Sequence, residues 1–320
     1  MLVGPVMRSA AALLPLETPE MPGDFGDYRV LSVIAEGGMG IVLRARDMRD
    51  RSEVALKMTR SPRRAEASAL RREIAVLRGV DHPGIVRLRD DGIYFGMPWM
   101  ALELLEGRTL CRTIGSRWCG LADTLSIVKQ LCGALGHLHD RGVVHRDVKP
   151  ANVMVGPGCR VTLFDFGLAC ATRHLALDHS RNNVGIGTAE YAAPEQLAGE
   201  PVDGRADIYA LGCMLYELVT GRRPFDAESE HDVARMQMHV EPRSPSELLT
   251  DMPCPLEELI LQMMAKRPEA RPATAGEVAR RLGHVASRLA RGTNEPLDVG
   301  FSRSVHGAGG GKGRASGRSA

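Results

Sequence analysis

The chain contains, in this order, His145-Arg-Asp-Val-Lys-Pro-Ala-Asn152, Asp165-Phe-Gly167 and Ala193-Pro-Glu195. The first two motifs stand 13 residues apart, counted from Asn152 to Asp165, a combination that chance would rarely produce. Upstream, residues 28–105 alternate short β-like runs with one helical stretch, and from residue 106 to 290 longer helical patterns dominate. The sequence therefore predicts a small β-rich part followed by a larger helical part.

The composition is that of an ordinary globular protein. The 320 residues include 41 Lys and Arg against 39 Asp and Glu, a net charge of +2, and 44% are hydrophobic. This balance argues against a protein whose main role is to coat nucleic acid. No run of 18 apolar residues occurs, so no membrane span is predicted. Seven cysteines without a C-x-x-C pair favour a reducing, cytoplasmic compartment.

Both ends of the chain are predicted to be disordered extensions. Residues 1–27 contain four prolines and little periodicity, and residues 291–320 are rich in Gly, Ser and Arg. The second of these segments holds five basic and two acidic residues. A basic tail can contact RNA, but a solvated tail is the simpler interpretation.

A glycine-rich turn joins two predicted strands near the start of the folded part. The strands are expected at Tyr28–Ile34 and Ile41–Ala45, and the turn between them is Glu36-Gly-Gly-Met-Gly40. Its glycines let backbone N–H groups approach a phosphate closely. The pattern departs from G-x-G-x-x-G because Ala35 stands where the first glycine belongs. Alone, such a turn is a weak signal.

One carboxylate falls on the apolar face of a predicted helix. Glu73 lies three residues after Leu70, on the apolar face of the helix expected over residues 65–77. A carboxylate there is costly unless a cation meets it, and Lys57 in the third predicted strand offers one. The residues alone leave open an alternative in which Glu73 only borders the apolar face.

In motif order and spacing the chain resembles the eukaryotic-type (Hanks-type) serine/threonine protein kinases, and in particular soluble bacterial members, over residues 28–289. The resemblance implies an α+β fold of two lobes, with a small β-rich lobe and hinge over 28–105 and a helical lobe over 106–290. It implies ATP and Mg²⁺, with Mn²⁺ as an alternative metal. The implied acceptors are Ser and Thr hydroxyls of proteins.

The resemblance assigns roles in the transfer step. Asp147 would orient the attacking hydroxyl, Lys149 would lie near the γ-phosphate, and Thr188 would contact both of them and help bind the acceptor. Asn152 and Asp165 would hold the metal, because Mg²⁺ prefers hard oxygen ligands.

In the small lobe, the resemblance implies that Lys57 binds the α- and β-phosphates and pairs with Glu73. Leu102 would be the gatekeeper beside the adenine, and Glu103 and Leu105 would offer it backbone groups. The full expected nucleotide site is Ala35, Glu36, Gly37, Gly38, Met39, Gly40, Val42, Ala55, Lys57, Leu102, Glu103, Leu105 and Met154.

Three residues are expected to have structural roles. Asp207 begins a nearly all-apolar stretch that predicts a buried helix. Its side chain can satisfy N–H groups at the helix start, and the resemblance adds hydrogen bonds to the catalytic loop. Arg271 would form a buried bidentate pair with Glu195.

A phosphorylation switch is also implied. Arg146, before Asp147, is typical of kinases that are controlled by phosphorylation of the activation loop. Ser180 is the first candidate phosphosite and Thr172 the second.

The main alternative is a pseudokinase that binds nucleotide as a signalling scaffold, for which Ala35 is the one supporting feature. A small-molecule phosphotransferase of related fold is less favoured, because the Ala-Pro-Glu segment and a long activation loop are present. The protein substrate, the upstream signal and pairing of two copies stay open.

Overall fold

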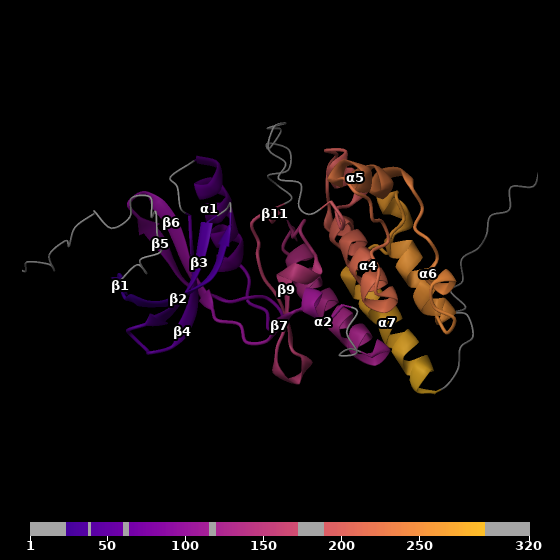
Figure 1. Ribbon diagram of the computed structural model, residues 1–320, viewed down its shortest axis with the longest axis horizontal. Coiled ribbons are helices and arrows are strands. Elements are labelled where there is room, and N and C mark those ends of the chain that lie inside the picture. Colours follow the sequence, from indigo (N-terminus) through magenta and orange to yellow (C-terminus); the bar gives the residue numbers. More distant parts are fainter. Residues whose placement is uncertain (1–23, 38–39, 60–63, 115–119, 172–188, 292–320) are drawn as a thin grey trace, which may run out of the picture.

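The computed structural model describes residues 24–37, 40–59, 64–114, 120–171 and 189–291. Within these ranges a β-sheet with one helix precedes a larger helical part, and Figure 1 shows these as two lobes. The arrangement confirms the α+β, two-lobed fold that the sequence predicts.

The small lobe is an antiparallel sheet with the strand order β1-β2-β3-β4-β6-β5. Helix α1 lies between β4 and β5 in the chain. The bounds are β1 Asp24–Phe25, β2 Tyr28–Gly37, β3 Gly40–Asp47, β4 Glu53–Met58, α1 Arg64–Arg78, β5 Leu88–Tyr94 and β6 Met97–Glu103. The three strands and the helix predicted here are confirmed, with slightly wider bounds.

Alternation along the central strands decides which side chains face α1. Leu56 of β4 and Ala101 of β6 are direct partners and belong to a hydrophobic cluster confined to the sheet. Ala55 and Leu102, one position along, pair with each other and join the cluster that contains α1. Lys57 is two residues from Ala55 and therefore projects on the same face as α1.

The large lobe is built from α-helices, short 3-10 helices and two small sheets. The helices are α2 Leu121–His139, α3 Pro194–Leu197, α4 Gly204–Thr220, α5 Glu230–His239, α6 Cys254–Met263 and α7 Ala275–Ala290. The 3-10 helices are η2 Leu110–Arg112, η3 Pro150–Asn152, η4 Pro157–Cys159, η6 Pro245–Glu247 and η7 Pro268–Ala270. Strands β7 Arg108–Thr109, β9 Val153–Val155 and β10 Val161–Leu163 form one sheet, and β8 Val143–Val144 pairs with β11 Cys170–Ala171. No helix among these described residues is long and apolar enough to cross a membrane.

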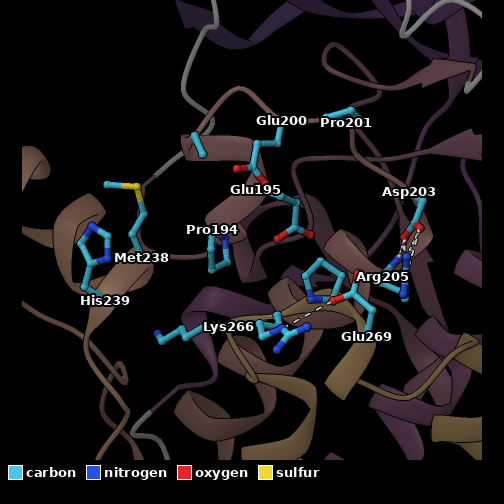
Figure 2. Close-up of a pocket in the computed structure, with 13 residues that line it drawn as sticks. Pro194, Glu195, Glu200, Pro201, Asp203, Arg205, Met238, His239, Lys266 and Glu269 are labelled. Atoms are coloured by element: carbon cyan, nitrogen blue, oxygen red, sulfur yellow. Dashed lines mark hydrogen bonds and ion pairs between the residues drawn. The ribbon is translucent and has the colours of Figure 1, made fainter.

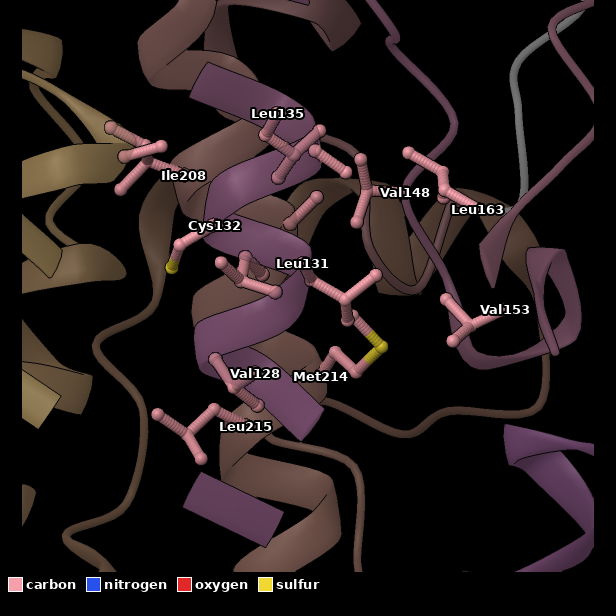
Figure 3. Packing of buried hydrophobic residues seen from close by; sticks show 14 of the residues in the cluster. Val128, Leu131, Cys132, Leu135, Val148, Val153, Leu163, Ile208, Met214 and Leu215 are labelled. Atoms are coloured by element: carbon pink, nitrogen blue, oxygen red, sulfur yellow. The ribbon is translucent and has the colours of Figure 1, made fainter. Parts of the chain in front are cut away.

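The core of the large lobe reaches the catalytic loop directly. Figure 3 shows Leu131 and Leu135 of α2 packed among Met214 of α4 and Val148, and all four belong to one buried cluster. Val148 lies between Asp147 and Lys149 in the chain and is 1% exposed. The core thus holds the backbone of the catalytic loop between its two charged residues.

The buried helix α4 is confirmed, because every residue from 206 to 217 is buried. The prediction that Asp207 satisfies its first N–H groups is wrong. Asp203 is the N-cap and accepts a hydrogen bond from the Arg205 N–H at 2.8 Å. Asp207 lies within the first helical turn, and its carboxylate accepts N–H groups from another segment.

Candidate active site

A half-buried lysine lies between two carboxylates where the two lobes meet. The Nζ atom of Lys57 is 2.9 Å from both carboxylate oxygens of Glu73 and 3.0 Å from Oδ1 of Asp165. Glu73, 2% exposed, also accepts the Phe166 N–H at 3.2 Å. The alternative in which Glu73 only borders the apolar face of α1 is therefore wrong.

Lys57 supports the charge of both carboxylates, although burial together with the charge of Asp165 raises the pKa of Glu73 overall. Burial alone would lower the pKa of Lys57, but the carboxylates of Glu73 and Asp165 outweigh it and raise that pKa. Burial would likewise raise the pKa of Asp165, and the Lys57 cation lowers it instead. At neutral pH, Lys57 is positive and Asp165 is negative.

A second cluster surrounds Asp147. The Nζ atom of Lys149 is 2.8 Å from Asp147 Oδ2, and the Asn152 side-chain amide donates to that oxygen and to the Asp147 carbonyl, both at 2.9 Å. Asn152 ends η3, whose first residue is a proline in the position that helices favour. These contacts fix the Asp147 carboxylate in one orientation.

The backbone is strained both in the catalytic loop and at Asp165, and one buried acid supports the loop. Arg146 has a φ of 66° and Asp165 a φ of 64°, values that are rare for residues other than glycine. Asp207, which is fully buried, accepts the His145 N–H at 2.9 Å and the Arg146 N–H at 2.8 Å. This result confirms the predicted bonds from Asp207 to the loop.

A ring contact within the large lobe lies next to Asp147 and Asp165. The rings of His145 and Phe166 lie edge to face, 4.8 Å apart. Burial lowers the pKa of His145, so the ring is neutral and belongs to the core.

The glycine-rich turn is a hairpin between β2 and β3. Gly37 pairs with Gly40, and Ala35 pairs with Val42. Glu36 and Gly37 lie at the exposed end of β2. Gly40 has a φ of 143°, and a Cβ there would lie 2.2 Å from the Met58 carbonyl oxygen, so only glycine fits. Ala35 lies in β2 without a positive φ, so its methyl group costs the hairpin no strain.

The expected adenine residues come from three strands and the chain just after β6. Ala55 and Leu102 lie opposite each other on β4 and β6, and together with Leu105 they contact the main core. Glu103 is held by a reciprocal pair of bonds, since its N–H donates to the Arg87 carbonyl at 2.9 Å and its carboxylate accepts the Arg87 N–H at 3.0 Å. Met154 lies half-buried on β9 in the other lobe.

The structure thus brings residues of the separate sequence motifs together, and comparisons with known proteins show the family. A model of the protein kinase domain matches residues 28–281. The chain belongs to the protein kinase family. This kinase is 38% identical over 291 residues to a probable serine/threonine-protein kinase of Corynebacterium efficiens, covering 85% of this chain and 44% of the relative.

Other relatives carry the name serine/threonine-protein kinase PknB. The one from Corynebacterium glutamicum, named as probable, is 35% identical over 81% of this chain and 42% of its own length. The one from Mycobacterium tuberculosis is 35% identical over 78% of this chain and 41% of its own length. The kinase therefore spans less than half the length of these relatives.

The donor set of the kinase suits the divalent metal that the family implies. The side-chain Nδ2 of Asn152 donates to two oxygens of Asp147, so the side-chain oxygen Oδ1 of Asn152 is the atom left for a cation. Asp165 uses Oδ1 for Lys57, and its side chain is 38% exposed. Mg²⁺ is commonly held by one or two protein oxygens together with substrate phosphates, which fits this pair. Among the described residues no cluster of three His, Cys, Asp or Glu forms a self-contained metal site.

Several expected positions lie outside the described residues of the kinase. They are Gly38 and Met39 of the glycine-rich turn, Thr188, and the candidate phosphosites Thr172 and Ser180.

The Arg271–Glu195 pair is confirmed. The guanidinium donates to both carboxylate oxygens of Glu195 at 2.6 and 2.8 Å. Its other N–H groups donate to the backbone carbonyls of Arg205, Ala265 and Lys266. All the donors of this buried side chain are thus used.

No role for Lys266 is predicted from the sequence, and in the structure its side chain packs against α5. Its Nζ donates to the Gln237 carbonyl at 2.9 Å and lies 4.3 Å from the centre of the Phe225 ring. Burial lowers the pKa of Lys266 to about 8. Figure 2 shows Lys266 with Met238, His239 and Pro194 around a pocket of about 430 Å³, which contains none of the expected catalytic residues.

Proposed function

We propose that this chain is an ATP-dependent serine/threonine protein kinase. The observation that carries the proposal is the joint assembly of two charged clusters, Lys57 with Glu73 and Asp165, and Asp147 with Lys149 and Asn152. Each cluster would serve one end of the reaction, the first the nucleotide and the second the acceptor. The serine/threonine relatives and Lys149, which follows the Asp147 motif in that class, support the choice of acceptor.

The transfer step follows from these positions. The acceptor oxygen forms a bond to the γ-phosphorus while the bond from that phosphorus to the oxygen bridging the β-phosphate breaks. The Asp147 carboxylate accepts the hydroxyl proton, and Lys149 offsets negative charge on the transferred group. Lys57, held by Glu73, positions the other phosphates.

Asn152 and Asp165 would hold Mg²⁺, with Mn²⁺ as a second choice, and the bound metal would neutralise phosphate charge. Ala55, Leu102, Leu105 and Met154 would contact the adenine. Glu36, Gly37, Gly40 and Val42 would cover the phosphates from the hairpin.

Activation by phosphorylation is part of the proposal. Arg146 has a buried Nε atom without a hydrogen-bond partner among the described residues. A phosphate on Ser180, or otherwise on Thr172, would give this group an anionic partner. The five free cysteines described support a reducing, cytoplasmic compartment.

The test is incubation with γ-labelled ATP and Mg²⁺, with and without a generic protein substrate. We expect label in the kinase and the substrate, and acid hydrolysis should release phosphoserine and phosphothreonine. Nucleotide binding without any transfer would favour the scaffold alternative. Phosphopeptide mapping should locate label between residues 168 and 187, and a fully active enzyme without phosphate there would contradict the switch.

A further inference from the structure

The segment that joins the activation loop to α3 is fixed to the catalytic loop. Residues 189–193 lead into α3, and the Gln196 side chain of α3 donates to the Arg146 carbonyl at 3.0 Å. Arg146 is the residue before Asp147. A protein substrate that places its hydroxyl at Asp147 would therefore meet residues 189–193 as a neighbouring surface, if the proposed function holds.

One buried glutamine of α5 holds the backbone of this segment. The Gln237 Nε2 atom donates to the Glu190 carbonyl oxygen at 2.6 Å, and Gln237 Oε1 accepts from the Tyr209 hydroxyl at 2.5 Å. The Gln237 side chain is 0% exposed. A buried amide is costly unless both its ends are bonded, and here both ends are used.

The glutamine is itself held from two sides. Lys266 donates to the Gln237 main-chain carbonyl at 2.9 Å and to the Tyr209 hydroxyl at 3.2 Å. Tyr209 belongs to the buried helix α4. The side chains of Tyr209 and Lys266 thus hold Gln237 in place, and Gln237 makes the bond to Glu190.

The side chains of the segment have their own partners. The Glu190 carboxylate is 2.7 Å from Arg223, and the Tyr191 hydroxyl donates to Glu217. These bonds hold side chains, whereas Gln237 bonds the Glu190 main-chain carbonyl. Gln237 therefore acts on the course of the backbone itself.

We propose that Gln237 is a positioning residue that sets the backbone of residues 189–193 for binding the protein substrate. Its loss should weaken binding of the protein substrate and leave nucleotide binding unchanged. We expect this split because the nucleotide residues Lys57 and Glu73 and the glycine-rich hairpin lie in the other lobe. The bonds of Lys57 go to Glu73 and Asp165, not to α5 or Glu190.

The test compares Gln237→Met with Gln130→Met. Methionine keeps the length of the side chain and removes both hydrogen bonds. Gln130 of α2 is a matched control, because its amide also joins two backbone groups, the Cys159 carbonyl at 3.0 Å and the Val161 N–H at 3.1 Å. KM for a protein substrate should rise about fivefold to tenfold in Gln237→Met, as expected for one lost hydrogen bond. KM for ATP should stay within twofold, and Gln130→Met should change neither.

Amide hydrogen exchange of residues 189–197 gives a second readout that needs no turnover. Exchange should accelerate in Gln237→Met and stay at the wild-type rate in Gln130→Met. If Gln237→Met does not fold, Gln237→Glu keeps the acceptor for Tyr209 and removes the donor to Glu190, and should show the same changes.

The outcomes separate the two proposals. A wild-type protein without transfer activity would refute the proposed function, and hydrogen exchange would still decide the role of Gln237. Unchanged exchange in residues 189–197 would overturn the role of Gln237. A parallel rise of both KM values would also overturn it.

Discussion

Replacing Arg271 by methionine should be among the most damaging single changes in the large lobe. The Arg271 side chain is fully buried, and it joins Glu195 of α3 to carbonyl groups at the start of α4 and before η7. The change leaves the Glu195 carboxylate, 5% exposed, without its cation, and leaves three carbonyl oxygens without that donor. Breaking a buried ion pair from one side costs about 3–5 kcal/mol.

Thermal unfolding measures this cost. With an unfolding entropy of about 2.1 cal/mol/K per residue over a domain of roughly 250 residues, Tm should fall by about 6–10 °C. Arg243→Met is the matched control, because the Arg243–Glu247 pair has side chains 57% and 55% exposed and should change Tm by about 1–2 °C at most. The double variant Arg271→Met, Glu195→Leu should be more stable than Arg271→Met alone. A drop for Arg271→Met no larger than that of the control would refute the reasoning.

Three further predictions follow from the site. Glu73→Gln removes the charge that fixes the Lys57 ammonium, so steady-state kinetics should show kcat at least about tenfold lower. Gly40→Ala brings a Cβ to 2.2 Å from a β4 carbonyl oxygen, whereas Gly37→Ala has open space, so fluorescent-nucleotide titration should show affinity about tenfold weaker only for Gly40→Ala. Burial would raise the pKa of Asp207. The hydrogen bond and charge of His139, together with backbone N–H groups, outweigh burial and lower that pKa overall. The Asp207 carboxylate therefore stabilises the fold above pH ~4 and loses this effect at lower pH. In urea unfolding, Asp207→Asn should cost about 3 kcal/mol at pH 7, and this cost should shrink below pH ~4.

Local pattern and the cost of burying charge predicted the small lobe well. The apolar period over residues 65–77 places Glu73 on the covered face of a helix, and Lys57 was the nearby cation in the third strand. The contact between them at 2.9 Å confirms the pairing. The family resemblance predicted the Arg271–Glu195 pair as a contact, whereas for Asp147, Lys149 and Asn152 it predicted roles and not the bonds among them.

The network that supports residues 189–193 could not be predicted from the sequence. Gln237 lies in α5 with no local sign of its partners, and Glu190 is 47 residues away along the chain. Lys266 bonds to carbonyl oxygens rather than to an acid, so charge pairing offers no signal for it. The predicted capping role of Asp207 is wrong, although an acid in the first turn of a helix suits a cap. Only the structure shows that Asp203 is the N-cap.

The backbone at Ala35 removes the one feature that supported the scaffold alternative. Its departure from the glycine pattern supported a scaffold without activity, but the residue lies in an ordinary strand paired with Val42. The hairpin needs its special backbone at Gly40 instead.

The most direct test of the central claim is a comparison of wild type with Asp147→Asn, measuring the single-turnover rate of γ-phosphoryl transfer and the Kd for ATP·Mg²⁺ in the same preparations. Asparagine keeps the size of the side chain, but it removes the negative charge beside Lys149 and cannot accept the hydroxyl proton. The transfer rate should fall by about 10²-fold or more, while the Kd changes less than about twofold. A variant that transfers phosphate at the wild-type rate would contradict the assignment of Asp147 and the proposed mechanism.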